Sequence, residues 1–212
     1  MPEPHAPTDP RLGRPRSVRA HNAVLAATAE LLAEGGYPAT TVDAISRRSG
    51  VSKATIYKHW PSRTAVAAEA FGGQMATAVR TPHTDDPRAD LVEQLRRVNR
   101  FYASPPGRVF AQLLAACVTD PEGAEYFREY FLAPRRKEIA ELWARANAAG
   151  LTRPGVDAEV ATDILFGPLI FRLMTGHDEL SDRNATAIAR AALDGLLNKS
   201  EVDGNATRVG VV

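Results

Sequence analysis

The sequence predicts an all-α protein in which a short module of three N-terminal helices precedes a larger helical domain. Apolar residues recur at spacings of three and four along most of the chain, and this spacing places them on one face of an α-helix. The periodic stretches begin at Ser or Thr, which favour helix starts, and stop at Gly or Pro, which favour helix ends. These two observations together indicate helices throughout.

Length and composition indicate one or two domains with an ordinary apolar core. The chain has 212 residues, of which 44% are hydrophobic and 24% are charged, as is usual for globular proteins. The longest apolar run, Ile164–Phe171, contains Gly167 and Pro168 and is far shorter than a membrane span. No apolar signal segment opens the sequence, and the single cysteine, Cys117, fits a reducing compartment. We therefore expect a cytoplasmic protein that does not enter a membrane.

Charge is distributed unevenly along the chain, although the formal net charge is only +1. Residues 10–64 contain nine Lys or Arg and three acidic residues, so this stretch carries +6 and the remainder carries −5. A basic segment attached to a mildly acidic body is typical of a module that binds a polyanion.

The first residues are expected to form a flexible arm followed by a helix. Residues 1–16 contain five prolines and no apolar period, so packed structure is not expected there. The arginines of GRPR at residues 13–16 could lie extended in a DNA minor groove, or they could only add positive charge to a disordered tail. A first helix should run from Ser17 to Glu34, because Gly35 and Gly36 follow at once.

Two more short helices follow, with the boundaries of a helix-turn-helix. Thr41 can cap a second helix that ends at Gly50. Ser52 can cap a third, which Pro61 stops. Short helices joined by a glycine-containing turn form this motif, so residues 17–64 are predicted as a DNA-binding domain of three helices.

The third helix should expose polar side chains opposite its apolar residues. At about 100° per residue, Ile56 and Trp60 share one face, which we expect to be buried. The opposite face and its margins carry small, polar or cationic residues: Ala54, Thr55, Lys58 and His59, then Lys53 and Tyr57. Helix-turn-helix proteins place this helix in the major groove. We predict that Lys and Thr read bases while Tyr57, His59 and Arg63 hold phosphates; the alternative is a solvated face in a small helical bundle.

The stretch GYPATTVDAISRRSGVSKATIYKHWPSR at residues 36–63, with the preceding VLAATAELLAEG, closely resembles the TetR family of bacterial transcriptional regulators. The resemblance covers residues 17 to 70. It implies an all-helical homodimer with a three-helix DNA-binding domain and a larger domain for ligand binding and dimerisation. Ser46 and Ser49 stand where alanine is common, and Pro38 precedes the Ala-Thr-Thr, but none of these differences removes a contact group.

The resemblance also implies roles for single side chains. In the family, one group typically contacts phosphates: here Thr41, Tyr57, His59 and Arg63. A second group approaches bases or flanking phosphates: here Ser52, Lys53, Ala54, Thr55 and Lys58. The implied partners are a double-stranded DNA operator, a second copy of the chain and a small-molecule effector.

Residues 65–200 are predicted to form a helical regulatory and dimerisation domain, followed by a flexible tail at residues 201–212. The expected helices span residues 63–79, 88–104, 109–118, 121–149, 156–176 and 182–198. The helix over residues 121–149 should bend or break near Pro134. Gly72-Gly73 marks either a kink that lets the DNA-binding domain pivot or a site of close helix packing.

The helix over residues 156–176 is apolar nearly all round, which requires cover on more than one side. With the last helix, it could supply half of a four-helix bundle that a second copy completes. The predicted interface residues are Phe166, Leu169, Ile170, Leu173, Leu193 and Leu196. A dimer would place two recognition helices one DNA turn apart on a palindrome. The alternative is that these residues fill the core of a single chain.

An aromatic-rich set in the same domain is the candidate effector pocket: Phe101, Tyr102, Phe110, Leu113, Leu114, Cys117, Trp143 and Phe166. The set has few charges, so a mostly apolar small molecule is expected. Taken singly, each of these residues is more often part of a core than of a pocket.

Enzyme motifs are absent from the sequence, which has no G-x-S-x-G elbow, no G-x-G-x-x-G loop and no P-loop. The five histidines show no paired metal spacing, so we expect no catalytic residue, metal or cofactor. We predict a homodimeric transcriptional regulator, a repressor that a small, mostly apolar ligand releases from a palindromic operator. The alternatives are a regulator that takes no ligand and acts on DNA or a protein partner, an activator, or a helical enzyme.

Overall fold

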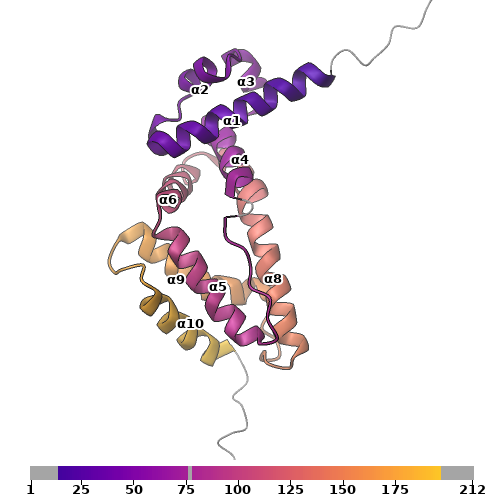
Figure 1. Cartoon of the computed structure of the whole chain (residues 1–212), viewed down its shortest axis with the longest axis vertical. Helices are drawn as coiled ribbons and strands as arrows, with labels where there is room; N and C mark the ends of the chain where they lie inside the picture. Colours follow the sequence, from indigo (N-terminus) through magenta and orange to yellow (C-terminus); the bar gives the residue numbers. More distant parts are fainter. Residues whose placement is uncertain (1–13, 76–77, 197–212) are drawn as a thin grey trace, which may run out of the picture. The chain divides into compact units, whose positions relative to one another are not determined.

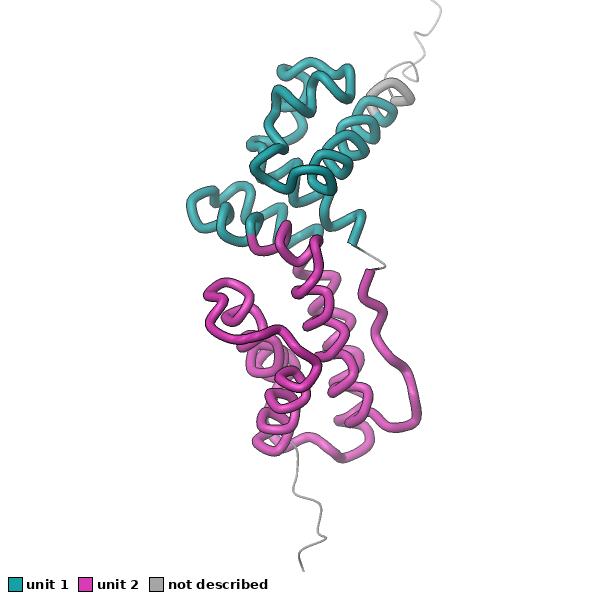
Figure 2. The backbone as a smooth tube through the Cα atoms, turned by 60° about the vertical axis from the view of Figure 1, so that its left-hand side comes forward, with its two compact units in different colours: residues 1–75, 112–131 teal, residues 76–111, 132–212 magenta. Residues whose placement is uncertain are grey.

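In the computed structural model, residues 14–75 and 78–196 are described, and their regular secondary structure consists of helices. The predicted all-α fold is therefore confirmed. The chain divides into two compact units: residues 1–75 with 112–131, and residues 76–111 with 132–212 (Figure 2). The predicted tail at 201–212 and the first part of the predicted arm lie outside the described residues. Among the helices described, none is long and apolar enough to cross a membrane.

The first unit opens with α1 (Arg14–Ala39) (Figure 1). This helix starts before Ser17, so the end of the predicted arm is helical and not extended. Pro15 fits there because N–H groups in the first turn have no partner within the helix. Gly36 leaves helical geometry, with φ 68° and ψ −169°, which confirms the predicted break at the glycine pair.

The helix-turn-helix consists of α2 (Val42–Ser49) and α3 (Lys53–His59). The side chains of Thr41 and Ser52 each accept a hydrogen bond from a backbone N–H in the first turn of the helix that follows. Gly50 ends α2 with φ 68°, a left-handed conformation that glycine adopts without steric cost. The predicted boundaries of both helices are confirmed.

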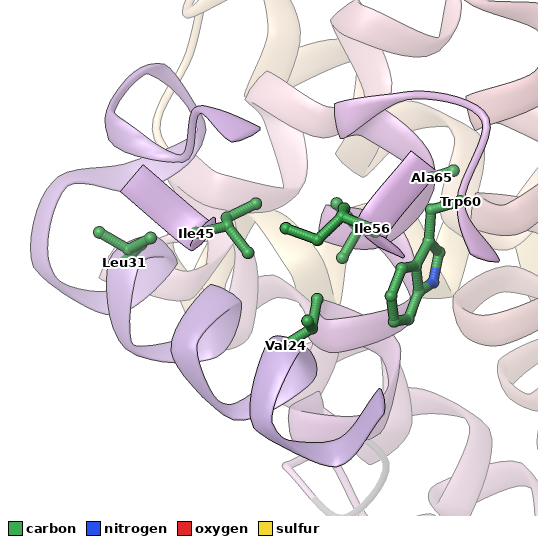
Figure 3. Packing of buried hydrophobic residues seen from close by; sticks show 7 residues of the cluster. Val24, Leu31, Ile45, Ile56, Trp60 and Ala65 are labelled. Atoms are coloured by element: carbon green, nitrogen blue, oxygen red, sulfur yellow. The ribbon is translucent and has the colours of Figure 1, made fainter. Parts of the chain in front are cut away.

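Side chains from α1, α2, α3 and α4 (Arg63–Met75) pack into one apolar core. Its buried members are Val24, Leu31, Ile45, Ile56, Trp60, Ala65 and Val66. In Figure 3, Ile45 from α2 and Ile56 from α3 point toward one another. Burial of each large apolar side chain contributes about 1.5–3 kcal/mol, so this core fixes the two short helices on α1.

The predicted helix over residues 121–149 is interrupted near Pro134, as the sequence predicts. It forms α7 (Pro121–Phe127), a π-helical turn η2 (Arg128–Leu132) and α8 (Ala133–Ala148). Pro134 has no backbone N–H to donate, so the hydrogen-bond ladder is irregular in the turn before it.

Glycines allow α4 to approach α7 and η2 closely. A Cβ atom added to Gly72 would lie 2.2 Å from the carbonyl oxygen of Tyr130. A Cβ atom added to Gly123 of α7 would lie 2.4 Å from Cβ of Thr64. By contrast, the same atom on Gly73 would meet nothing within 4 Å. Of the two explanations for Gly72-Gly73, close packing is the one observed, and it concerns Gly72 alone.

The second unit contains α5 (Pro87–Tyr102), α8, α9 (Ala158–Thr175) and α10 (Asp182–Leu196), with the first part of α6 (Pro105–Cys117). Its core includes the fully buried leucines Leu91, Leu95, Leu142, Leu165, Leu169 and Leu193. The structure begins α6 at Pro105 rather than at Val109, because prolines are tolerated in a first helical turn.

A buried carboxylate holds the segment before α5 against α8. Asp90 is 2% exposed and accepts hydrogen bonds of 2.8 Å from both the backbone N–H and the hydroxyl of Thr84. Arg145 of α8 pairs with the same carboxylate at 3.0 Å. Arg135, also in α8, donates to the carbonyl of Val79 at 2.9 Å. The segment is thus anchored to α8 by charged hydrogen bonds, which are the stronger kind.

Candidate DNA-binding surface

Helix α3 has one buried side and one exposed side, as the sequence predicts. Ile56 and the following Trp60 are each 1% exposed. The exposed residues of α3 are Lys53, Ala54, Tyr57, Lys58 and His59, and Thr55 is half-buried. Donors to anions and a small alanine therefore face outward together, while the two large apolar side chains secure the helix from behind.

Two predicted contact residues at the start of α3 are also structural. The Ser52 hydroxyl accepts a hydrogen bond from the backbone N–H of Thr55 at 3.3 Å, and the two side-chain hydroxyls lie 2.9 Å apart. A hydroxyl has one donor and two acceptor sites, so each retains capacity for a DNA atom. These contacts fix the side chains in place before DNA arrives.

A hollow of about 470 Å³ brings four predicted DNA-contact residues together. Thr41, Lys53, Tyr57 and Arg63 line it, with Val42, Asp43, Pro61 and Ser62. Hydroxyl, ammonium, phenol and guanidinium groups are all donors to phosphate oxygens. The predicted residues Ala54, Lys58 and His59 do not line this hollow and lie elsewhere on the exposed side of α3. The site therefore combines a hollow lined by potential phosphate donors with an exposed face of α3.

Asp43 is a member of the hollow that the sequence analysis did not include. It forms an ion pair with Lys53, and the hydrogen bond and charge of that ammonium hold the pKa of Asp43 below its usual value. The carboxylate of Asp43 therefore competes with a phosphate for the ammonium group of Lys53. The pair joins α2 to α3, and only the folded arrangement of the two helices reveals it.

Arg63 is held in position by a tyrosine from the end of α1. Its Nε donates to the Tyr37 hydroxyl at 3.0 Å, and its guanidinium carbon lies 4.3 Å from the centre of the Tyr37 ring. The Tyr37 hydroxyl also lies 2.8 Å from the Thr64 hydroxyl, and the Tyr37 backbone N–H donates to Gln112 at 2.9 Å. A guanidinium has five N–H donors, so Arg63 keeps donors for phosphate.

The end of α3 is secured by residues that lie between 9 and 67 positions away in the sequence. Trp60 donates its indole N–H to the Glu69 carboxylate at 2.6 Å, and the same carboxylate lies 3.0 Å from Nε2 of His21. The imidazole of His21 stacks on Trp60 with ring centres 4.7 Å apart. Tyr126 of α7 donates its hydroxyl to the carbonyl of His59 at 3.1 Å. Sequence periodicity placed Trp60 in the core but could not identify these partners.

Comparison with known proteins gives two family matches. Residues 24–70 match the model of bacterial regulatory proteins of the tetR family, and residues 81–192 match a Tetracyclin repressor-like C-terminal domain. The second match alone covers more than half of the chain. The protein belongs to the TetR family. It is accordingly a DNA-binding transcriptional regulator and not an enzyme.

Individual TetR-family proteins are similar over most of their length. The HTH-type transcriptional regulator YdeS of Bacillus subtilis (strain 168) is 35% identical over 87% of this chain and 93% of its own. The crystal structure of the TetR family transcription regulator SCO0332 has a TM-score of 0.73 and 36% identity, covering 84% of this chain and 98% of that one. FadR from Bacillus subtilis, solved in complex with stearoyl-CoA, has a TM-score of 0.57 with 16% identity, covering 82% of this chain and 98% of its own. At that identity, FadR shares the fold only.

The predicted effector residues of this TetR-family protein are divided between the two units. Phe101, Tyr102, Phe110, Trp143 and Phe166 belong to the second unit, whereas Leu113, Leu114 and Cys117 belong to the first. Within the second unit, the rings of Tyr102 and Phe110 pack 4.9 Å apart, and burial raises the pKa of Tyr102. A hollow of about 400 Å³ in that unit contains none of the predicted residues; its lining is Arg80, Thr81, Pro82, His83, Glu138, Glu141, Leu142 and Arg145.

The residues predicted for the dimer interface are not the apolar residues that α9 exposes. Leu169 and Leu193 are fully buried within the chain and Phe166 is buried, so these three have almost no surface left for a second copy. Ile170 and Leu173 are half-buried, and the side chain of Leu196 lies outside the described part. The exposed apolar residues of α9 are instead Val160, Ile164, Phe171 and Met174. An all-round apolar pattern could not show which face of α9 turns inward.

Proposed function

We propose that the protein is a homodimeric repressor that binds a palindromic operator in the cytoplasm and is released from it by a small molecule. The observation that carries the dimer is the exposed side of α9. Val160, Ile164, Phe171 and Met174 are between 42% and 62% exposed. At about 100° per residue they fall on one stripe, opposite the buried Ala161, Leu165 and Leu169. This arrangement supports the proposal that a partner covers the exposed apolar stripe of α9.

A second copy of the same helix is the partner that best fits this stripe. A two-fold interface brings the same patch of both subunits together, so an apolar stripe is complementary to itself. Helix α9 has 18 residues and is therefore about 27 Å long at 1.5 Å per residue. Gly167 lies within the stripe, and a Cβ atom there would meet nothing within 4 Å. Two such helices could approach closely at that point.

Dimerisation also compensates for the small size of the recognition element. Helix α3 has seven residues, so a single copy can reach few base edges. Helix-turn-helix dimers gain specificity by reading two half-sites one turn of DNA apart, which makes their operators palindromic. The phosphate hollow at Thr41, Lys53, Tyr57 and Arg63 would then be used twice. Operator binding should therefore weaken steeply with salt.

Release by a ligand has more general support. FadR shows that this fold can hold a small molecule, and the packed rings of Tyr102 and Phe110 give the second unit an aromatic interior. A mostly apolar effector is the class that such an interior favours. An effector needs only about 1–3 kcal/mol of coupling to change operator affinity 5- to 150-fold. Compounds that raise the melting temperature and release operator DNA would identify it.

The experiment that tests the dimer compares Phe171→Glu with Val118→Glu. Both remove an exposed apolar side chain and add one negative charge, but Val118, which is 82% exposed, lies outside α9. Phe171→Glu places a charge in the apolar stripe that the partner would cover, so we expect it to be monomeric by sedimentation and at least about 10-fold weaker on the operator. Val118→Glu should remain dimeric. A Phe171→Glu protein that is dimeric with full operator affinity would refute the α9 interface.

A further inference from the structure

Helix α7 belongs to the DNA-binding unit although its sequence lies within the match to the C-terminal domain. Residues 112–131 form one compact unit with residues 1–75, whereas the C-terminal family match spans residues 81–192. Tyr126 of α7 is half-buried and packs against the core that holds Ile56 and Trp60. A residue within the C-terminal family match therefore contacts the apolar core on which the recognition helix α3 packs.

The hydroxyl of Tyr126 makes a particular contact with that helix. It donates to the carbonyl of His59, the last residue of α3, over 3.1 Å. The last carbonyls of a helix have no partner within the helix. Since α3 has only seven residues, a contact at its end influences its whole orientation. A second anchor near this end is the bond from the Trp60 indole N–H to Glu69 of α4.

Tyr126 is itself held on a firm base. Its ring stacks on that of Tyr130, with the ring centres 5.7 Å apart. The backbone of Tyr130 lies against Gly72 of α4. Burial, with the nearby carboxylate of Glu69, raises the pKa of Tyr126. The phenol therefore stays protonated near neutral pH and can keep donating to the His59 carbonyl.

We propose that Tyr126 is a positioning residue for operator recognition, which sets the orientation of the C-terminal half of α3. That half presents Tyr57, Lys58 and His59 to DNA. Helix α7 continues through η2 into α8 of the second unit, so the segment that supplies this hydrogen bond is joined directly along the chain to the second unit. The inference rests on operator binding by α3, as in the proposed function, and it does not depend on which effector binds.

The test compares Tyr126→Phe with Tyr130→Phe, which removes a hydroxyl from the other ring of the same stack. The wild-type protein is first used to select its operator from random DNA. Affinities of all three proteins are then measured for that operator, for a variant with one changed base in each half-site, and for unrelated DNA. Measurements are made well below the melting temperatures, so that every protein is fully folded.

We expect Tyr126→Phe to bind the operator about 3- to 10-fold more weakly, as for loss of one hydrogen bond, with unchanged affinity for unrelated DNA. Its preference for the operator over the changed sequence should fall by a similar factor, whereas Tyr130→Phe should stay within about 2-fold of wild type. Wild-type affinity and preference in Tyr126→Phe would overturn the inference. An equal loss on all DNA, or a lowered melting temperature without lost preference, would reduce Tyr126 to a structural role. If the wild type selects no sequence, the proposed function itself fails.

Discussion

Replacing Gly72 by alanine adds one methyl group where α4 meets η2. That carbon would lie 2.2 Å from the Tyr130 carbonyl oxygen and 2.6 Å from its carbonyl carbon. Comfortable contacts between non-bonded heavy atoms are roughly 3.5–4.0 Å, so a backbone must move by about 1 Å. Because the obstructing atoms belong to the backbone, a side-chain rotation cannot relieve the clash. Gly73 is the matched control, since it neighbours Gly72 in the same helix and has open space at this position.

The two substitutions should have opposite signs. Overpacking costs about 1–3 kcal/mol, while replacing a helical glycine by alanine contributes up to about 1 kcal/mol. Gly72→Ala should therefore lower the free energy of unfolding by about 1–2 kcal/mol, and Gly73→Ala should raise it by about 0.5–1 kcal/mol. For a chain of this length, each kcal/mol corresponds to roughly 2–4 °C. The two variants should differ by about 3–12 °C in melting temperature.

Thermal and urea unfolding at one protein concentration would measure these differences. The operator affinity of Gly72→Ala should also fall, because the displaced segment carries Tyr126 as well as Tyr130. If Gly72→Ala were as stable as Gly73→Ala, the close approach of α4 to η2 would be refuted. If Gly72→Ala were destabilised but bound the operator with full affinity at low temperature, the packing of α4 on η2 would contribute to stability and not to DNA recognition.

Two further predictions concern carboxylates. Asp43→Asn frees Lys53 and removes a negative charge from the hollow at Thr41, Lys53, Tyr57 and Arg63, so operator affinity at low salt should rise about 2- to 5-fold and the gain should shrink as salt screens it; equal or weaker binding in titrations at two salt concentrations would contradict this. Burial of Asp90 opposes ionisation, but the bonds from Thr84 and Arg145 outweigh it and hold its pKa below the ordinary value of 3.8. A lowered pKa stabilises the fold above that ordinary value, and the contribution is lost as pH falls through the folded value. Asp90→Asn should thus cost about 1.5–3 kcal/mol near pH 7, and its melting temperature should fall less than that of the wild type between about pH 5 and pH 3; parallel pH profiles would argue against this role.

The sequence predicts the helix-turn-helix well because its signals are local. Thr41 and Ser52 cap the helices that they directly precede, Gly50 ends one of them, and the spacing of Ile56 and Trp60 identifies the buried side of α3. Each of these features depends on neighbours within a few positions. The nine predicted DNA-contact residues remain predictions, but eight of them are exposed and four line one hollow, which is consistent with that role.

The features that the sequence does not predict depend on contacts between distant residues. Tyr37 holds Arg63, and Tyr126 bonds to His59 across 67 positions. No period or spacing links such pairs. The inward face of α9 could not be predicted for another reason: its large side chains surround the helix, so helical periodicity has no preferred direction. Burial of Leu169 and exposure of Phe171 could be separated only by the packing of neighbouring helices.

The DNA-binding unit is built from two separate lengths of chain, residues 1–75 and 112–131. A fragment ending at Met75 would therefore leave the Gly72 side of α4 uncovered and the His59 carbonyl without its phenol. A chimera that joins those 75 residues to the body of another regulator would inherit a foreign α7, and its operator preference need not follow the transplanted recognition helix. Among related sequences, we therefore expect substitutions at Gly72, Gly123 and Tyr126 to accompany substitutions in the DNA-binding unit. We do not expect them to accompany changes in the rest of the C-terminal domain, although Gly123 and Tyr126 lie within its sequence.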